Sequence, residues 1–325
     1  MADSKIEWTD ATWNPVVGCT RVSPGCDHCY AATMTRRLEA MGQEDYAGLT
    51  TKKHFNGVVR TLEHKLDLPL RWKNPRMVFV NSMSDLFHAD VPFEFIDKVF
   101  CIMNATAWTL PISQRSKRWH VYQVLTKRPD RMAAYMLSRA ERFEVGEHPV
   151  FKVRGEVMRG HGSELMNAAA CLQWPPENVW LGTSCENQAA ANERIPHLLR
   201  CQAAVRFLSC EPLLGPISLD FRYPLCMTNA YVRHCIQKSL QWVIVGGESG
   251  AGARPCDLAW IRSIIVQCKA AGVPIFCKQL GARPYIQGLE IKLPVTIADK
   301  KGGCIDEWPE DLRIREFPNV STTQV

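Results

Sequence analysis

The sequence contains no apolar run that approaches the ~20 residues of a membrane-spanning helix. Its start, Met1 to Asp10, is polar and acidic, unlike a secretory signal peptide. No internal repeat or low-complexity segment is evident along the 325 residues, of which 46% are hydrophobic and 22% charged. We therefore expect a globular cytoplasmic protein without a membrane partner, large enough for one barrel-sized domain or two smaller ones.

The sequence also lacks the pattern of a disulfide-stabilised protein, although it holds 14 cysteines. The cysteines are scattered through apolar runs such as Val99–Met103 and Ile275–Cys277, where a thiol serves as a small buried apolar side chain. This use of cysteine is typical of a reducing compartment and agrees with the expected cytoplasmic location.

Three cysteines near the N-terminus form a different pattern. Cys19, Cys26 and Cys29 have the spacing C-x6-C-x2-C, with Gly and Pro around them and helix-forming residues after them. Three thiolates on one loop are able to hold three irons of a [4Fe–4S] cluster and to leave the fourth iron open for a small molecule, whereas an electron-transfer cluster uses four cysteines. The motif therefore predicts an open-site cluster with these three residues as its metal ligands.

Two alternatives stay open for the motif. A structural zinc ion needs four ligands, usually as two pairs, and the second pair is missing here. His28 lies inside the motif and is a candidate fourth zinc ligand. In the other alternative the three cysteines bind nothing and belong to the core.

Short apolar runs alternate with helical patterns along the chain. The runs are almost continuously apolar, which is typical of parallel strands buried on both faces, and the alternation predicts α/β architecture. The expected strands are Pro15–Cys19, Met77–Asn81, Val121–Thr126, Val179–Thr183, Val205–Ser209, Gln241–Gly246 and Pro274–Lys278. The expected helices are Ala31–Met41, Phe93–Ala107, Arg128–Arg142, Gln188–Leu199 and Leu258–Ala271.

An open doubly wound sheet would show the same alternation, but a phosphate-binding G-x-G-x-x-G after the first strand is absent. Polar residues instead follow the carboxyl ends of many strands, where a (β/α) barrel builds its site. We therefore expect a barrel of six core strands plus an extra strand at Pro274–Lys278. The tail, residues 299–325, carries Gly-Gly and Trp-Pro pairs and is expected to wrap the barrel without regular structure.

Two insertions interrupt this order, at about 144–177 and 222–240, and we expect each to form a lid over the barrel mouth. The second insertion contains Cys226, His234 and Cys235. These are three candidate ligands for a further metal site, one fewer than a closed zinc site needs.

The motif also carries a resemblance. A three-cysteine loop after a first strand, with an aromatic residue directly after the last cysteine, resembles the radical S-adenosylmethionine (radical SAM) superfamily, although the usual spacing there is C-x3-C-x2-C. The chain more closely resembles the phage-associated three-Cys-motif family of radical-SAM-like proteins, over nearly its whole length. The matching stretches are Trp13–Cys19, Val80–His88, Leu125–Pro129, Trp180–Ser184, Val245–Gly250 and Lys278–Gly281.

The resemblance implies a fold and cofactors. The fold is a partial (β/α)6 TIM-like barrel of the radical SAM type over residues 1–298, with an extra C-terminal strand and insertions. The cofactors are a [4Fe–4S] cluster and S-adenosyl-L-methionine, whose amino and carboxylate groups bind the open iron. One electron from an external flavodoxin- or ferredoxin-like donor cleaves a C–S bond, and the resulting 5′-deoxyadenosyl radical abstracts a hydrogen from the substrate.

The resemblance also indicates where S-adenosylmethionine binds. In the superfamily a Gly-Gly-Glu run after the second strand binds the ammonium group, and by position Ser82, Ser84 and Asp85 stand there in this chain. The alternative for Asp85 is a helix N-cap. Gly246-Gly247-Glu248 spells the triplet but follows the sixth strand, so we expect it to contact adenine or substrate. The further cofactor-binding candidates are Ser184, in a matching stretch, and Tyr30, directly after the last cysteine. We expect Tyr30 to pack on the cluster or the adenine, and the alternative is that it begins the helix core.

Four charged residues at other strand ends are candidate catalytic residues. Glu186 and Glu211 would contact ribose hydroxyls or substrate amines. Lys127 and Lys278 would pair with a carboxylate or a phosphate. The alternative for each is a salt bridge on the rim of the barrel.

The net charge of +6 is concentrated in the first half, where residues 1–160 hold 23 Lys and Arg against 18 Asp and Glu. Basic residues with aromatic neighbours suit a phosphate backbone and unstacked bases, whereas any single cluster is equally a solvated helix face. We therefore expect a nucleic acid or a modified nucleotide as partner. The clusters are Arg36-Arg37, Lys52-Lys53-His54, Arg71-Trp72-Lys73, Arg115–His120 and Lys127-Arg128.

These expectations combine into one main hypothesis. The family context suggests a phage enzyme that acts in the host cytoplasm and isomerises an amino-acid-decorated thymine during DNA hypermodification. A radical SAM lyase or small-metabolite enzyme is one alternative. A zinc-stabilised nucleic-acid-binding protein without catalysis is the other.

Overall fold

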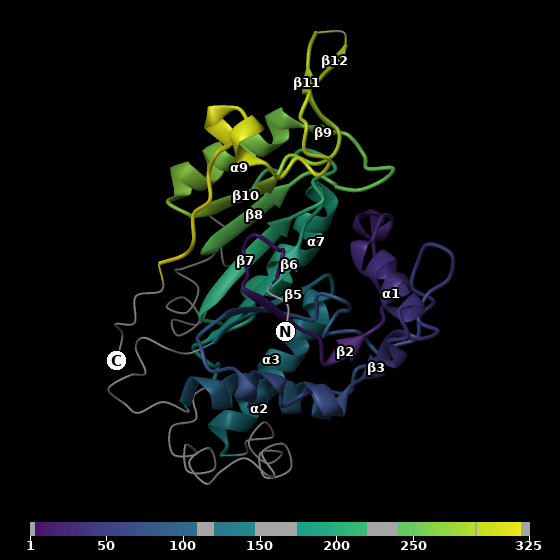
Figure 1. Ribbon diagram of the computed structural model, residues 1–325. Helices are drawn as coiled ribbons and strands as arrows, with labels where there is room; N and C mark the ends of the chain where they lie inside the picture. Colours follow the sequence, from purple (N-terminus) through teal and green to yellow (C-terminus); the bar gives the residue numbers. More distant parts are fainter. Residues whose placement is uncertain (1–3, 109–119, 147–173, 220–239, 290, 320–325) are drawn as a thin grey trace. The chain divides into compact units, whose positions relative to one another are not determined.

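The computed structural model places the chain in two compact units. The residues that it describes are 4–108, 120–146, 174–219, 240–289 and 291–319 (Figure 1). The first unit comprises Met1–Val22, Cys29–Leu181 and Arg200–Ala204, and the second comprises Ser23–His28, Gly182–Leu199 and Val205–Val325. The predicted division into a domain over 1–298 and a tail over 299–325 stays a prediction.

The first unit combines parallel strands, helices and one antiparallel ribbon. Its elements are β1 (Ala11–Trp13), β2 (Val16–Val17), α1 (Tyr30–Ala40), β3 (Arg60–Thr61), β4 (Met77–Val80), α2 (Phe93–Trp108), β5 (Val121–Thr126) and α3 (Pro129–Glu144), with 3-10 helices at Glu44–Tyr46, Glu63–Lys65 and Leu68–Arg71. Strand β4 pairs in parallel with both β1 and β5. Strands β2 and β3 form the ribbon, and Val17 of β2 packs in one apolar cluster with Ala31 of α1.

The second unit continues the parallel strands and adds a small sheet. Its elements are β7 (Val205–Cys210), α7 (Gln188–Leu199), β8 (Trp242–Gly246), β9 (Cys256–Asp257), α9 (Leu258–Ala271), β10 (Ile275–Gln279), β11 (Pro284–Gln287) and β12 (Lys292–Pro294), with 3-10 helices at Pro24–Cys26, Ile305–Glu307 and Glu310–Leu312. Local signals set the ends of α9. The Asp257 side chain accepts a hydrogen bond from the Ala259 N–H, and Gly272 ends the helix at φ +67°.

Strand β6 (Val179–Ser184) belongs to both units, since its first three residues count with the first unit and its last three with the second. The hydrogen-bonded order in the main sheet is β1-β4-β5-β6-β7-β8-β10. Each strand adds beside the previous one without the reversal that a doubly wound sheet requires. The order is therefore that of a partial (β/α) barrel, as the sequence predicted (Figure 1).

The apolar runs that predicted the sheet are its buried strands. Every residue of β6, β7 and β8 is buried. This is typical of parallel strands, because the helices that connect them shield the sheet from solvent. The last strand, β10, has its outer edge covered by the tail. There Cys277 N donates to Ile314 O at 2.8 Å and Glu316 N donates to Ile275 O at 2.9 Å, so the described part of the tail protects an edge that would otherwise pair with other chains.

The prediction of Pro15–Cys19 as the first core strand is wrong in its place, since only Val16–Val17 forms a strand there and that strand lies outside the main sheet. The main sheet begins with β1, whereas Val16 and Val17 pair with β3. Pro15 has no N–H to give to a sheet ladder, and the Val16 N–H donates to the Asn81 side chain at 3.3 Å instead. Both valines are fully buried, which explains why the run looked like a core strand.

Parts of several predictions fall outside the described residues. These are most of the 144–177 insertion, nearly all of the 222–240 insertion with Cys226, His234 and Cys235, and the basic residues Arg115, Lys117 and Arg118. Among the residues that the structure does describe, no helix combines the length and the apolar character needed to cross a membrane.

A glycine in β6 tests the packing of β6 against β7. A Cβ added at Gly182 would lie 2.5 Å from ring carbons of Phe207, which is fully buried. We expect Gly182→Ala to lower the free energy of unfolding by about 1–3 kcal/mol, because overpacking forces the ring and strand apart. Thermal or urea unfolding measures the loss. Gly215→Ala is the matched control, since its nearest neighbour would be 3.9 Å away; equal losses in both variants would contradict the packing.

Candidate functional site

The three cysteines of the N-terminal motif lie on one loop, partly exposed and free of any disulfide. Cys19 follows β2, Cys26 ends a 3-10 helix, and Cys29 directly precedes α1. The other described cysteines are buried, except the exposed Cys304. Three thiols on this loop are therefore accessible to solvent and to a ligand, as is typical of metal-binding and reactive cysteines.

The donor chemistry of this loop fits an iron–sulfur cluster. Within the described residues, no three His, Cys, Asp or Glu side chains gather closely enough to hold one metal ion. A cubane makes a different demand, since each thiolate binds a separate iron. Cys19 and Cys29 belong to the first unit and Cys26 to the second, so the loop passes from one unit to the other and back.

In the first unit, the loop after β4 is tied to the segment that leads into the cysteine motif. Asn14 Oδ1 accepts hydrogen bonds from the Ser82 hydroxyl at 3.1 Å and from the Met83 N–H at 3.0 Å. The Ser84 hydroxyl donates to Val16 O at 2.8 Å. The sequence predicted Ser82 and Ser84 near the cofactor ammonium. In the structure their hydroxyl groups bind the segment that leads into the motif.

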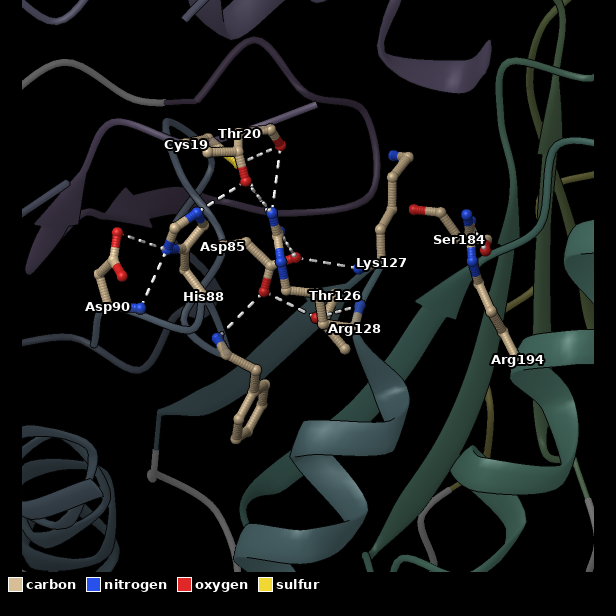
Figure 2. A network of polar contacts seen from close by, with 11 residues as sticks. Cys19, Thr20, Asp85, His88, Asp90, Thr126, Lys127, Arg128, Ser184 and Arg194 are labelled. Atoms are coloured by element: carbon tan, nitrogen blue, oxygen red, sulfur yellow. Dashed lines mark hydrogen bonds and ion pairs between the residues drawn. The ribbon is translucent and has the colours of Figure 1, made fainter. Parts of the chain in front are cut away.

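The Asp85 carboxylate is the centre of a buried polar network (Figure 2). One oxygen accepts from the Thr126 hydroxyl at 2.7 Å and the Phe87 N–H at 3.0 Å. The other accepts from the Lys127 N–H at 3.1 Å and Arg128 at 3.0 Å. Because a carboxylate has about four acceptor positions, a cofactor ammonium would have to displace one of these donors.

Arg128 joins Asp85 to the cysteine loop. Its guanidinium donates to Cys19 Sγ at 3.7 Å, to Thr20 O at 3.1 Å and to the Thr20 hydroxyl at 2.7 Å. Burial raises the pKa of the Cys19 thiol to about 11, with Asp85 adding to the rise and Arg128 opposing it. Burial also disfavours the charge of Arg128, yet Asp85 and Cys19 outweigh it and raise the pKa of the guanidinium.

Sequence reasoning named Lys127 as a site residue and Arg128 only as part of a basic cluster, whereas the structure places the Arg128 side chain in this network. The signal was Pro129, which occupies the first position of α3 and so places the preceding side chain at the end of β5. The Lys127 side chain extends away from Asp85 in Figure 2, and its backbone N–H makes the contact with the carboxylate.

Two rings complete this side of the loop. The Tyr30 hydroxyl donates to Ser82 O at 2.6 Å, and the Tyr30 side chain is half exposed at 56%. His88 Nε2 lies 2.8 Å from the Thr20 hydroxyl. Burial and the nearby Arg128 lower the pKa of His88 below its usual value, so its imidazole is neutral at neutral pH. Tyr30, expected on the cluster or adenine, thus connects α1 to the loop after β4.

In the second unit, Glu248 organises the turn that carries Cys26. Its carboxylate accepts from His28 Nδ1 at 2.9 Å and from Arg254 through Nε at 2.9 Å and a terminal nitrogen at 2.5 Å. Arg254 also donates to Pro24 O at 2.9 Å. Burial opposes ionisation of Glu248, but the bonds from Arg254 and His28 prevail and lower its pKa. Because an ionised carboxylate only accepts hydrogen bonds, His28 Nδ1 carries the proton of this contact.

The glycines before Glu248 serve packing. A Cβ at Gly247 would lie 2.2 Å from Leu280 O, and one at Gly246 would lie 3.1 Å from Gln279 O. The pair, expected at adenine or substrate, therefore lets the end of β8 approach the segment after β10.

Glu186 lies beneath the same turn. Its carboxylate accepts from Arg194 at 2.9 Å, and a Cβ on Gly25 would come within 3.1 Å of its carboxyl carbon. Both Glu186 and Arg194 are almost fully buried. Arg194 also donates to Ser184 O at 2.9 Å (Figure 2). Two predicted site residues, Glu186 and Ser184, are thus held by an arginine that sequence reasoning did not name.

The remaining two predicted catalytic residues pair with each other. Lys278 Nζ lies 2.8 and 2.9 Å from the two Glu211 carboxylate oxygens, one of which also accepts from Gln279 at 3.0 Å. Their side chains are 19% and 15% exposed. The geometry is that of the rim salt bridge that stood as the alternative for both residues.

Comparison with known proteins adds the family. Residues 3–287 match a family model described as "Protein of unknown function (DUF5131)". The chain belongs to this family. No curated protein matches the chain. No solved structure matches it either.

A carboxylate substitution tests the second-unit network of this family member. We expect Glu248→Gln to lower the free energy of unfolding at neutral pH by about 1–3 kcal/mol, because charge-assisted bonds from Arg254 and His28 are weakened. The folded pKa of Glu248 is lowered, so its contribution is present above its unfolded pKa of about 4.3 and is lost as the pH falls through the lower folded value. The two proteins should therefore converge in acid.

Urea unfolding from pH 7 down to pH ~3 measures this convergence. Glu310→Gln, at an exposed carboxylate, is the control and should unfold like the wild type throughout. A difference between Glu248→Gln and wild type that stays constant with pH would contradict the role of the ionised carboxylate.

Proposed function

We propose that this protein is a radical SAM enzyme whose [4Fe–4S] cluster is held by Cys19, Cys26 and Cys29. One observation carries the proposal: three free, partly exposed thiols share a loop in a chain whose other described cysteines are, with one exception, buried. The singly wound strand order is the arrangement that the proposal requires. When bound, the cluster and S-adenosylmethionine together supply the one-electron chemistry that yields a 5′-deoxyadenosyl radical.

The chain's own residues hold the ligand loop at both of its parts. In the first unit Arg128 binds the Cys19–Thr20 segment and Asp85 fixes Arg128. In the second unit Arg254 binds the carbonyl of Pro24, two residues before Cys26, and Glu248 fixes Arg254. Each half therefore uses a carboxylate–arginine pair to orient the backbone beside a ligand, which is how outer-shell contacts orient metal ligands.

The proposal extends to the substrate. We propose a modified thymine base in phage DNA, rearranged by an isomerase reaction, with reduction by a flavodoxin- or ferredoxin-like donor. Two basic clusters support a polyanionic partner, because Arg36 donates to Lys52 O and so brings Arg36-Arg37 beside Lys52-Lys53. These four side chains are exposed on the first unit, as phosphate contacts require.

Serine substitutions test the cluster. An open-site cubane has no spare thiolate, so Cys19→Ser, Cys26→Ser and Cys29→Ser should each lose the iron, the sulfide and the broad visible absorbance of anaerobically reconstituted protein. Cys304→Ser, at an exposed cysteine outside the loop, is the control and should keep all three. Full iron content in any of the loop variants would contradict the assignment, and bound zinc without iron would favour the nucleic-acid-binding alternative.

Salt dependence tests the partner. Replacement of Arg37, Lys52 and Lys53 by Ala should weaken DNA binding and flatten the plot of log affinity against log salt by about two to three units, at roughly 0.9 per phosphate contact on duplex DNA. Fluorescence anisotropy from low to moderate salt gives the slope. Glu44→Gln, a neutralised exposed carboxylate, serves as control. Turnover of a free nucleoside without DNA binding would favour the small-metabolite alternative.

A further inference from the structure

The contact between Arg128 and Cys19 has a consequence for redox chemistry. Arg128 stands between the end of β5 and the start of α3, and its backbone N–H donates to the Thr126 hydroxyl at 2.9 Å. Its side chain lies between Asp85 and the Cys19–Thr20 segment (Figure 2). The guanidinium therefore meets the first cysteine of the motif from a fixed support.

The contacts use the forked shape of arginine. One terminal nitrogen reaches both Asp85 at 3.0 Å and Cys19 Sγ at 3.7 Å, while the other reaches the Thr20 carbonyl and hydroxyl oxygens at 3.1 and 2.7 Å. A lysine has one nitrogen on a flexible stem, whereas arginine has a planar fork of donors. A lysine is therefore unable to contact all four acceptors at once. The four contacts thus require arginine, whereas lysine would supply the positive charge alone.

The charge of Arg128 acts in a poorly screened place. The Arg128 and Asp85 side chains are only 14% and 7% exposed, so salt and water weaken their fields little. The Arg128 guanidinium lies 3.7 Å from Cys19 Sγ, and its charge is opposite to that of the Asp85 carboxylate, which it binds at 3.0 Å. The two groups therefore influence negative charge on this sulfur in opposite directions, and loss of Arg128 would leave the Asp85 carboxylate unopposed.

Negative charge on the sulfur is what reduction of an iron–sulfur centre increases. Net charge and hydrogen bonds to the cysteine sulfurs are among the factors that set the reduction potential of such a centre. A cationic N–H donor at a ligand sulfur stabilises the form with one more electron.

We propose that Arg128 is a positioning residue that holds the Cys19 thiolate and raises the reduction potential of the centre bound there. The proposal rests on the proposed function, because it needs a cluster on Cys19. The step is a one-electron uptake from a low-potential donor, dithionite in the test, with no bond formed or broken in the protein. Without Arg128, the physiological donor would reduce a smaller fraction of the enzyme.

A redox titration followed by electron paramagnetic resonance tests the proposal on the full-length, anaerobically reconstituted protein. We expect Arg128→Gln to lower the ratio of reduced to oxidised cluster at a fixed solution potential by about tenfold, which is ~59 mV for one electron. Arg128→Lys keeps the charge and should stay within about threefold of wild type, or ~30 mV.

Arg131→Gln is the matched control, because Arg131 lies in the first turn of α3, three residues after Arg128, but donates to Val91 O and covers the Phe93 ring. It should titrate like the wild type. A fully loaded Arg128→Gln with the wild-type potential overturns the inference and leaves the proposed function intact. A wild type that binds no cluster overturns both.

The lysine variant keeps the test decisive if Arg128→Gln fails to load. A loaded Arg128→Lys with nearly the wild-type potential, beside an unloaded Arg128→Gln, supports the role of the charge. A loaded Arg128→Lys shifted tenfold or more in its ratio contradicts it.

Discussion

The buried carboxylate of Asp85 is the interaction on which the cysteine loop in the first unit depends. It accepts four hydrogen bonds, from the loop after β4, from the end of β5 and from Arg128. Arg128 in turn binds Thr20. Removal of the carboxylate would leave several buried donors unsatisfied at once, which costs more than the loss of one bond. The position of Cys19 therefore depends more on Asp85 and Arg128, which follow β4 and β5, than on contacts within the cysteine loop.

The second unit repeats this arrangement with different residues. Glu248 follows β8, fixes Arg254 and thereby fixes the turn that contains Cys26. Glu186 lies against Gly25 beside the same cysteine. Glu186 follows the carboxyl end of β6 and Glu248 that of β8, and barrel folds place their functional groups at such strand ends. Much of the charge at these strand ends thus holds the cysteine loop in place through arginine side chains.

The sequence predicted the fold better than the site. Six of the seven strands were found, because continuous apolar runs identify strands buried on both faces. The first was misplaced, because Val16 and Val17 are equally buried in a ribbon. The polar residues at strand ends predicted Asp85, Glu186, Glu211, Glu248 and Lys278 as site residues, but not which groups pair with which. Glu211 and Lys278 are 67 residues apart, and no local pattern shows that they neutralise each other. Arg254 was missed for the same reason, and Arg128 was named only as part of a basic cluster.

The central claim is that the three thiols hold a cluster with one open iron. Its most direct test is electron paramagnetic resonance of the anaerobic, dithionite-reduced protein before and after addition of S-adenosylmethionine. The account predicts a reduced [4Fe–4S] signal that changes when S-adenosylmethionine is added, because its amino and carboxylate groups would bind the open iron. A protein without iron, or a cluster signal that S-adenosylmethionine leaves unchanged, would contradict it.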